Sequence, residues 1–423
     1  MNTIKYLGFF ISLVILLGCS SKEKTSGKVK EVIKSDSLFL FTKTKALEIV
    51  KNGFSAGDNY EEVWIRDFNT FIELSAEVFD SDILKEYLLI FFRMQGDNGN
   101  IIDGYIPKEK VGDLGYDYIY SDLEPRYAGH KNTVETDQET SLIQAVYKYV
   151  QSTGDHNILN EMIGDISVRD RMENALLFLM NHRFNKEYGL LWGATTADWG
   201  DVQPEHEWGV YITDDTHFAI DIYDNAMFLL ALDNFIELVP SGKEKWQKVR
   251  DDIASNTRKH LWDDEKHKYR PHIYLNGSPF PQDFDEEEIF YHGGTAVAIE
   301  AGLLSKTEVL RSLEQMVENT DKAGAASIGL TLYPPYPEGY FKNKSMAPYC
   351  YQNGGDWTWF GARMIQQLIR YGYIEEAYEH IRPMVKRVKE NDGFYEWYTI
   401  DNEPRGSGTF RGSAGVLYKA IQM

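Results

Sequence analysis

The spacing of apolar residues is the feature that most constrains how this 423-residue chain can fold. Beyond about residue 37, apolar side chains recur every three to four residues, as on the buried faces of amphipathic helices. Strand-like alternation is scarce and confined to short pieces such as 269–275. We therefore predict an all-α protein with helices at 84–92, 142–150, 176–180, 226–238, 309–317, 363–371 and 374–388.

Long loops rich in Trp, Tyr, Gly and carboxylates separate these helices. With about 32 residues per helix and loop, roughly 390 residues give about twelve helices. No linker rich in Pro, Gly or Ser interrupts the chain after residue 37, which predicts one unit at 38–423. An (α/α)6 toroid with its loops gathered into a cup at one end fits this count. Pro383 falls inside the last helical run, where proline kinks or splits a helix. The loops lie at 59–69, 97–107, 189–215, 327–356 and 392–411.

Charge and composition exclude several classes of function. The formal net charge is −21, which argues against nucleic acid as a partner, because phosphate binding needs clustered Lys and Arg. The glycine-rich segment 405–415 lacks the preceding strand and the Lys of a phosphate loop, so no nucleotide site is expected. His pairs flanking a Glu, Cys clusters and a Gly-x-Ser-x-Gly turn are also missing from the sequence. We expect neither a metal nor another cofactor.

The N-terminal segment has the pattern of a lipoprotein signal. Lys5 precedes an uncharged, mostly apolar run, and Leu16-Leu17-Gly18-Cys19 resembles a bacterial lipobox, which makes 1–18 a signal peptide and Cys19 the acylated residue. An ordinary signal peptide, or an anchor helix with a chance Cys, is the alternative. Residues 19–37 are polar and Lys-rich, as in a flexible tether. We expect a lipid-anchored protein at the outer membrane of a Gram-negative bacterium, on its periplasmic face or the cell surface.

Such a location favours activities that need no ATP or NAD, namely hydrolysis, polymer binding or a structural role. The loops contain what a sugar pocket needs, since sugar rings stack on aromatic side chains and their hydroxyls bind Asp, Glu, Arg and Asn. Hydrolysis of a glycosidic bond further needs two carboxyl groups, one protonated and one ionised.

Two loops offer an aromatic residue beside carboxylates. Trp64-Ile65-Arg66-Asp67 opens a helix, and Arg66 is expected to keep Asp67 ionised while Asp67 binds sugar hydroxyls. The alternative is a helix-capping Asp with a surface ion pair. In the second loop Asp198 and Asp201 flank Trp199 and Gly200, where desolvation by Trp can raise a carboxyl pKa. An acidic surface turn is the alternative there.

Two further loops combine aromatic and acidic residues. Asp356-Trp357-Thr358-Trp359 opens another helix, and because the two Trp lie two residues apart, we expect one in the core and one in the pocket. Phe394-Tyr395-Glu396-Trp397-Tyr398 places one carboxylate among four aromatic residues. That setting suits a positioned catalytic base or a buried, hydrogen-bonded Glu.

Taken in order, these segments, together with Tyr223-Asp224-Asn225-Ala226, resemble the six-hairpin glycosidases, nearest to the amylo-α-1,6-glucosidase and processing α-glucosidase I groups. The resemblance implies an (α/α)6 barrel and inversion at the anomeric carbon. It implies Glu396 as general base and Asp198 as general acid. Asp201 is the rival acid, since the α-glucosidase I group has the order Gly-Trp-Asp. Substrate-binding residues would be Trp64, Arg66, Asp67, Trp199, Asp356, Trp357 and Trp397.

The sequence thus predicts an inverting glycoside hydrolase that acts on oligosaccharides or polysaccharide ends outside the cytoplasm, without a cofactor. Two alternatives stay open. One is a polysaccharide lyase on the same barrel, which would need a Tyr or His base and a cation for the uronate. The other is a lipid-anchored glycan-binding protein without catalysis. The sequence leaves the sugar, the linkage and the oligomeric state open.

Overall fold

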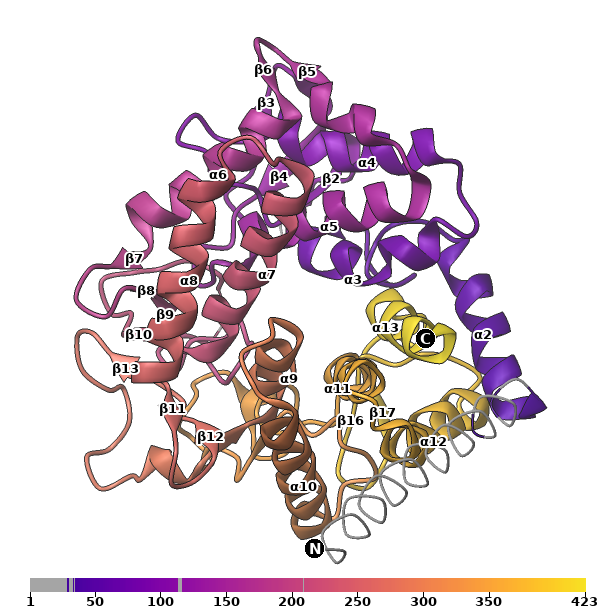
Figure 1. Cartoon of the computed structure of the whole chain (residues 1–423), viewed down its shortest axis with the longest axis vertical. Helices are drawn as coiled ribbons and strands as arrows, with labels where there is room; N and C mark the ends of the chain where they lie inside the picture. The colour runs from indigo at the N-terminus through magenta and orange to yellow at the C-terminus, as the bar shows by residue number, and fades with distance from the viewer. Residues whose placement is uncertain (1–28, 30–32, 34, 113–115, 208) are drawn as a thin grey trace, which may run out of the picture.

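The computed structural model describes residues 29, 33, 35–112, 116–207 and 209–423, and it confirms the all-α prediction. Within these ranges the chain forms twelve helices that alternate along the sequence between an outer and an inner ring (Figure 1). The outer helices are α2 (Ser37–Val50), α4 (Ser81–Arg93), α6 (Val168–His182), α8 (Lys243–His260), α10 (Lys306–Ala323) and α12 (Ile374–Glu390). The inner helices are α3 (Ile65–Ser75), α5 (Asp137–Thr153), α7 (Ile222–Leu238), α9 (His292–Glu300), α11 (Thr358–Arg370) and α13 (Arg411–Gln422).

The inner ring is closed. Each inner helix packs against the next one in sequence, and α13 packs back against α3. The two backbones approach closely at Gly415, where a Cβ atom would lie only 2.4 Å from the carbonyl oxygen of Thr70 and 2.5 Å from Cα of Phe71. Glycine therefore permits the contact that joins the first and last hairpins. The predicted (α/α)6 toroid is confirmed.

Burial differs between the two rings for a simple geometric reason. Inner helices are covered on most sides, and α11 is buried continuously from Thr358 to Leu368. Outer helices bury one stripe, as in α8, where the buried residues are Trp246, Ile253 and Thr257. Pro383 does not split α12, and the carbonyl group that loses its usual donor belongs to Glu379, an exposed residue that water can reach.

Short strands, more numerous than the sequence suggests, brace the loops. A four-stranded antiparallel sheet has the order β1 (Val63–Trp64), β2 (Gly104–Pro107), β4 (Glu124–His130) and β3 (Ile119–Ser121). A three-stranded sheet has the order β13 (Ile273–Tyr274), β10 (Phe218–Ile220) and β9 (Gly193–Ala194). The two-stranded pairs are β5 (Met162–Ile163) with β6 (Ile166–Ser167), β7 (Phe184–Asn185) with β8 (Leu190–Leu191), β11 (Trp262–Asp263) with β12 (Lys268–Tyr269), β14 (Phe290–Tyr291) with β15 (Leu332–Tyr333), and β16 (Trp397–Tyr398) with β17 (Pro404–Arg405). Short 3-10 helices are η1 (Lys108–Lys110), η2 (His156–Asn160), η3 (Glu286–Glu288) and η4 (Lys344–Met346).

Strands β1, β10 and β14 lead directly into α3, α7 and α9, so they fix where these inner helices begin.

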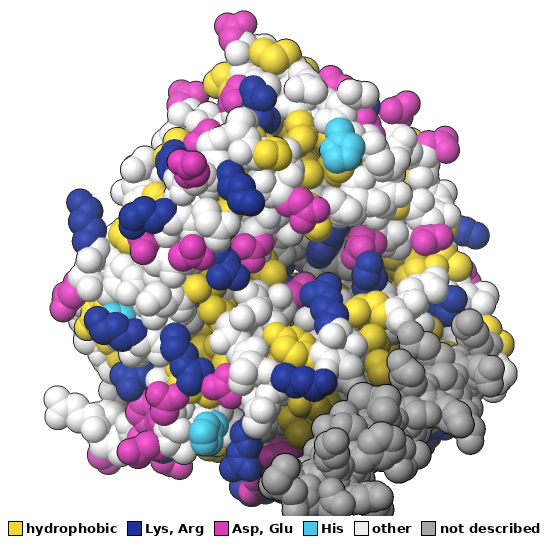
Figure 2. Space-filling view, in the orientation of Figure 1, with side chains coloured by type: hydrophobic (Ala, Val, Ile, Leu, Met, Phe, Trp, Pro, Cys, Tyr) yellow, Lys and Arg dark blue, Asp and Glu magenta, His cyan; other side chains and the backbone are white. Residues whose placement is uncertain are grey.

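The two ends of the ring differ. The long aromatic loops lie where the inner helices begin. At the other end, side chains from all six inner helices surround a polar hollow, and Figure 2 shows acidic and basic side chains around the middle of the viewed face.

The predicted signal peptide at 1–18, Cys19 and most of the predicted tether at 19–37 lie outside the described residues. Within the described part of the chain, no helix is both long enough and apolar enough to span a bilayer. Cys350 is a free cysteine.

Candidate active site

A cavity of about 630 Å³ opens at the end of the ring where the inner helices begin. Its walls come from the segments that precede α3, α5, α7, α11 and α13, so residues far apart in sequence meet there. Of the residues predicted for the site, seven line this cavity: Trp64, Arg66, Asp67, Trp199, Asp201, Trp357 and Glu396. Asp198, Asp356 and Trp397 are not among the lining residues.

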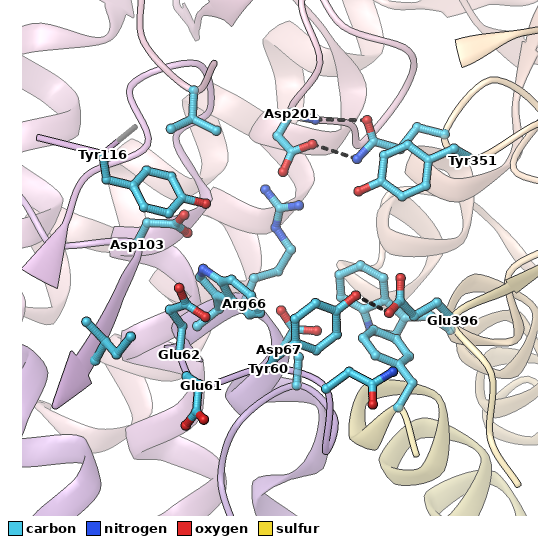
Figure 3. Close-up of a pocket in the computed structure, with 18 of the residues that line it drawn as sticks. Tyr60, Glu61, Glu62, Arg66, Asp67, Asp103, Tyr116, Asp201, Tyr351 and Glu396 are labelled. Carbon is cyan, nitrogen blue, oxygen red and sulfur yellow. Dashed lines mark hydrogen bonds between the residues drawn. The ribbon is translucent and has the colours of Figure 1, made fainter. Parts of the chain in front are cut away.

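Glu396 is held through one of its two carboxylate oxygens. Oε1 accepts hydrogen bonds from the hydroxyl of Tyr60 and from the backbone N–H of Ser407, the latter at 2.9 Å (Figure 3). Oε2 accepts none from a described residue. Burial raises the pKa of Glu396, and the bond from Tyr60 opposes this rise. Gly406 makes room for the group, since it has φ +74° and a Cβ there would lie 2.4 Å from the carboxyl carbon.

Asp201 is held in the same way from another wall. The side-chain amide of Gln352 donates to Oδ1 of Asp201 at 2.7 Å and accepts from its backbone N–H at 3.3 Å. Oδ2 accepts no hydrogen bond from a described residue. Figure 3 shows Asp201 and Glu396 approaching the cavity from different sides, with Arg66 reaching toward Asp201. Two carboxylates, each with one free oxygen, therefore face a common space.

Asp198, the general acid that the resemblance implies, makes its hydrogen bonds within the fold. Both of its carboxylate oxygens accept from the backbone N–H of Gly294, at 2.8 and 3.0 Å, and its side chain is buried. Gly294 lies in the first turn of α9, so Asp198 satisfies a free N–H group at the start of that helix. Its backbone adopts φ 57°, which directs the chain through the turn before Trp199. Of the two candidate acids, the structure brings Asp201, and not Asp198, to the cavity.

Asp356 also makes its contacts within the fold. It forms a buried ion pair with Arg387 of α12, and it accepts from the hydroxyl of Ser327 at 2.6 Å and from its N–H at 3.1 Å. These contacts tie two loops to an outer helix. They involve both carboxylate oxygens, and the substrate-binding role of Asp356 stays a prediction.

Trp397, the first residue of β16, is not among the residues that line the cavity. Its ring lies against Gly355, where a Cβ would be 3.1 Å from Trp397, and its centroid is 6.4 Å from that of Tyr351. Trp397 therefore packs behind the wall of the cavity.

The prediction that only one of Trp357 and Trp359 belongs to the pocket is wrong, because both line the cavity. Trp357 has extended backbone angles and precedes α11, so the angular offset between helical residues does not apply to the pair. The Trp199 ring meets both nearly edge-on, with centroid separations of 4.8 and 5.2 Å. The three indoles form one aromatic wall.

The prediction that Arg66 keeps Asp67 ionised is also wrong. Burial raises the pKa of Asp67 to about 7, although the charge of Arg66 opposes the rise. Arg66 instead forms ion pairs with Glu135 and Asp137, at and just before the start of α5. Asp67 is thus partly protonated near neutral pH and can donate as well as accept a hydrogen bond.

Sequence reasoning missed several lining residues, among them Tyr60, Asp103, Tyr116 and Tyr351. Burial raises the pKa of Asp103 to about 7, again against the charge of Arg66. With 27 Tyr in the chain, no single tyrosine stands out by its type. The available signal was their place in the predicted loops, since 59–69 contains Tyr60, 97–107 contains Asp103 and 327–356 contains Tyr351.

The cavity is rich in carboxyl groups and poor in available cations. Among the described residues, six carboxyl groups line it, against two cations, Arg66 and Lys110. Lys110 is paired with Glu61, and Arg66 with the two carboxylates named above. Among the residues that the structure describes, no group of three or more His, Cys, Asp or Glu could hold a metal ion. Such a site suits an uncharged, hydroxyl-rich ligand.

Comparison with solved structures finds the same architecture in glycosidases. A GH63 mannosylglycerate hydrolase from Thermus thermophilus, in complex with glucose, matches with a TM-score of 0.63 at 15% identity over 89% of this chain and 99% of that chain. A rhamnosidase from Klebsiella oxytoca with rhamnose bound matches with a TM-score of 0.60 at 13% identity, over 92% of this chain and 64% of that one. A GH78 rhamnosidase of Bacillus sp. GL1 matches with a TM-score of 0.60 at 14% identity, over 91% of this chain and 34% of that one.

No family model and no curated protein matches the chain. At these identities the likeness to solved structures establishes the fold alone, an (α/α)6 barrel. The finer resemblance to the amylo-α-1,6-glucosidase and α-glucosidase I groups stays a prediction.

The placement of Asp198 predicts a stability effect. Replacing it with Ala should lower the free energy of unfolding by about 1–2 kcal/mol, because the N–H of Gly294 loses its acceptor. Asp198→Asn keeps one acceptor oxygen and should lose less. Urea denaturation of the two variants beside the wild type measures both effects. Equal midpoints for the wild type and Asp198→Ala would contradict a capping role.

Proposed function

We propose that this protein is an inverting glycoside hydrolase that acts on neutral oligosaccharides or polysaccharide ends. The observation that carries the proposal is the meeting of Asp201 and Glu396 in one aromatic-walled cavity, each with one oxygen free for chemistry. The fold shared with a mannosylglycerate hydrolase and two rhamnosidases supports it.

In the proposed reaction Asp201 donates its proton to the oxygen of the departing sugar as the glycosidic C–O bond breaks. Glu396 takes a proton from a water molecule, whose oxygen bonds to the anomeric carbon from the opposite face. Both carboxyl groups return to their starting states after one proton exchange with solvent.

The remaining lining residues suit a pyranose ring. Trp64 and the wall of Trp199, Trp357 and Trp359 offer apolar surfaces for its C–H faces. Asp67 and Asp103, with pKa values of about 7, can each donate to one sugar hydroxyl or accept from another.

The charge of the cavity favours hydrolysis of a neutral sugar over elimination from a uronate. A lyase needs a cation to neutralise the uronate carboxylate, yet Arg66 and Lys110 are already paired with protein carboxylates. Six carboxyl groups in the lining would also repel an acidic sugar.

Substitution of the two carboxylates tests the mechanism. Glu396→Gln and Asp201→Asn should each lower kcat by about 10²–10⁴, the usual weight of general acid–base catalysis. The assay follows sugar release by mass spectrometry from glucose-, mannose- and rhamnose-terminated glycans and from uronate polymers. Proton NMR of fresh product reports the anomer formed.

Asp103→Asn is the matched control, because it removes a carboxyl group from the same cavity and should cost about tenfold through a lost hydrogen bond. A larger loss of kcat in Asp103→Asn than in Asp201→Asn would indicate that Asp103 is the general acid. Near wild-type turnover in folded Glu396→Gln would refute the mechanism. An ultraviolet-absorbing unsaturated product would identify a lyase, and saturable binding without any product would identify a glycan-binding protein.

The bond between Tyr60 and Glu396 predicts a pH effect. Its removal in Tyr60→Phe raises the pKa of Glu396 further, since the hydroxyl no longer stabilises the carboxylate. The base must be ionised, so the acidic limb of the kcat/KM profile should move to higher pH by about one unit. Tyr147→Phe is the control, because it removes a tyrosine–glutamate bond, to Glu237 at 3.0 Å, at the other end of the ring. An unmoved limb in Tyr60→Phe would exclude Glu396 as the titrating base.

We also propose that the protein is anchored through lipid on Cys19 at the outer membrane of a Gram-negative bacterium, where it degrades extracellular glycans. The proposal rests on the sequence Leu16-Leu17-Gly18-Cys19. Expressed in a Gram-negative host, the wild type should partition into the detergent phase, whereas Cys19→Ala should not. Equal partitioning of the two proteins would rule out the lipid anchor.

A further inference from the structure

Three tyrosines at alternate positions lead away from the cavity. Tyr116 lines the cavity, Tyr118 is partly buried, and Tyr120 is 55% exposed. They belong to the segment that enters β3, the edge strand of the sheet whose other edge, β1, contains the cavity residue Trp64. Figure 3 shows Tyr116 on the side of the cavity remote from Glu396. We call these three residues the tyrosine row.

The inner end of the row is rigidly supported. The Tyr116 ring lies parallel to that of His130, with centroids 4.1 Å apart and planes 5° apart. Burial lowers the pKa of His130 to about 4, so its ring is uncharged at neutral pH. One face of Tyr116 is thus covered by a fixed aromatic ring, and its other face is available to a ligand in the cavity. The Tyr118 ring stands nearly perpendicular to it at 6.1 Å.

The middle of the row holds an unused hydrogen-bonding group. The hydroxyl of Tyr118 is shielded from water and has no hydrogen-bond partner among the described residues. Tyr211 is fixed beside this segment, because its hydroxyl accepts the backbone N–H of Asp117 at 2.8 Å. Because this hydroxyl is shielded, the partly exposed ring of Tyr118 is the part of the side chain that a ligand can contact.

The outer end of the row is exposed and apolar. Among the described residues, seven large hydrophobic side chains are exposed, and three of them, Ile119, Tyr120 and Leu123, lie on the β3–β4 hairpin. Lys108 Nζ stands 5.1 Å from the centroid of the Tyr120 ring and supports it from one side. The concentration of exposed apolar surface at this hairpin, next to the cavity, indicates a binding surface.

We propose that the tyrosine row binds sugar units of the substrate that lie outside the cavity, so that the natural substrate is an oligosaccharide or polysaccharide chain with several units. This inference rests on the proposed glycosidase function and extends it. The tyrosines of the row are two residues apart along the chain, and the rings of Tyr116 and Tyr118 are 6.1 Å apart, which gives successive sugar rings successive aromatic partners.

Chain-length dependence tests the row. For the wild type, kcat/KM should rise from disaccharide to hexasaccharide in a neutral gluco-, manno- or rhamno-oligosaccharide series. Tyr120→Ala and Tyr118→Ala should each lower kcat/KM for the hexasaccharide about three- to tenfold more than for the disaccharide, as expected for a lost aromatic contact. Tyr118→Phe keeps the ring and serves if Tyr118→Ala does not fold. Met162→Ala on the β5–β6 hairpin is the control, since Met162 is 59% exposed and lies outside the row.

Calorimetric binding of the same series to Glu396→Gln separates this proposal from the proposed function. Suppose that affinity rises with chain length and falls in the double variant Glu396→Gln/Tyr120→Ala, but the wild type shows no turnover. This result would support binding by the tyrosine row and contradict the hydrolase function. If the wild type turns over substrate and the tyrosine variants lose kcat/KM equally on short and long substrates, the hydrolase function is supported and binding by the tyrosine row is contradicted. No binding and no turnover with any series would overturn both.

Discussion

The buried ion cluster around Arg66 is the interaction on which the rest of the cavity depends. Its guanidinium, at the start of α3, binds Glu135 and Asp137 at the start of α5, and the hydroxyl of Tyr223 from α7 donates to Asp137 at 2.9 Å. Three inner helices are thereby joined at the floor of the cavity. A buried charge left without a partner costs several kcal/mol, about 3–5 on removal of one member of a pair, so these helices cannot separate independently there.

The direction of the inner helices favours carboxylates at the end of the ring that contains the cavity. All six begin at this end, so their N-terminal N–H groups and the positive ends of their dipoles face the site. Asp198 binds one of these N–H groups directly at α9, and Asp67 and Asp137 lie in the first turns of α3 and α5. Burial of these carboxyl groups still disfavours their charged form, and it raises the pKa values of Asp67 and Asp103 to about 7. Both groups are therefore partly protonated at neutral pH.

Much of the architecture follows from the sequence, because helical periodicity reports burial directly. The number of helices, the position of most of them, the closed ring and the acidic aromatic cup were predictable, as was the presence of Glu396 among aromatic residues. Helices α2, α8, α9 and α13 were not located from the sequence. The choice between Asp198 and Asp201 could not be predicted from the sequence. The turn at Asp198, with φ 57°, directs the Asp198 side chain to the start of α9 and leaves Asp201 at the cavity. The sequence did not show why residue 406 is a glycine. Only the fold shows that the carboxyl group of Glu396 lies where a Cβ atom of residue 406 would be. Tertiary contacts of this kind leave no local pattern.

The closure of the ring between α13 and α3 has a consequence for how the site comes into being. Tyr60 precedes the first inner helix and Glu396 precedes the last, and the same seam holds the contacts from Arg411 to the backbone oxygens of Ala56 and Ser55. A chain emerging from the ribosome has made most of its barrel before Glu396 exists, and the carboxylate finds its tyrosine only when the last hairpin docks on the first. The cavity therefore gains Glu396, the carboxylate proposed as the general base, only when the last hairpin has docked.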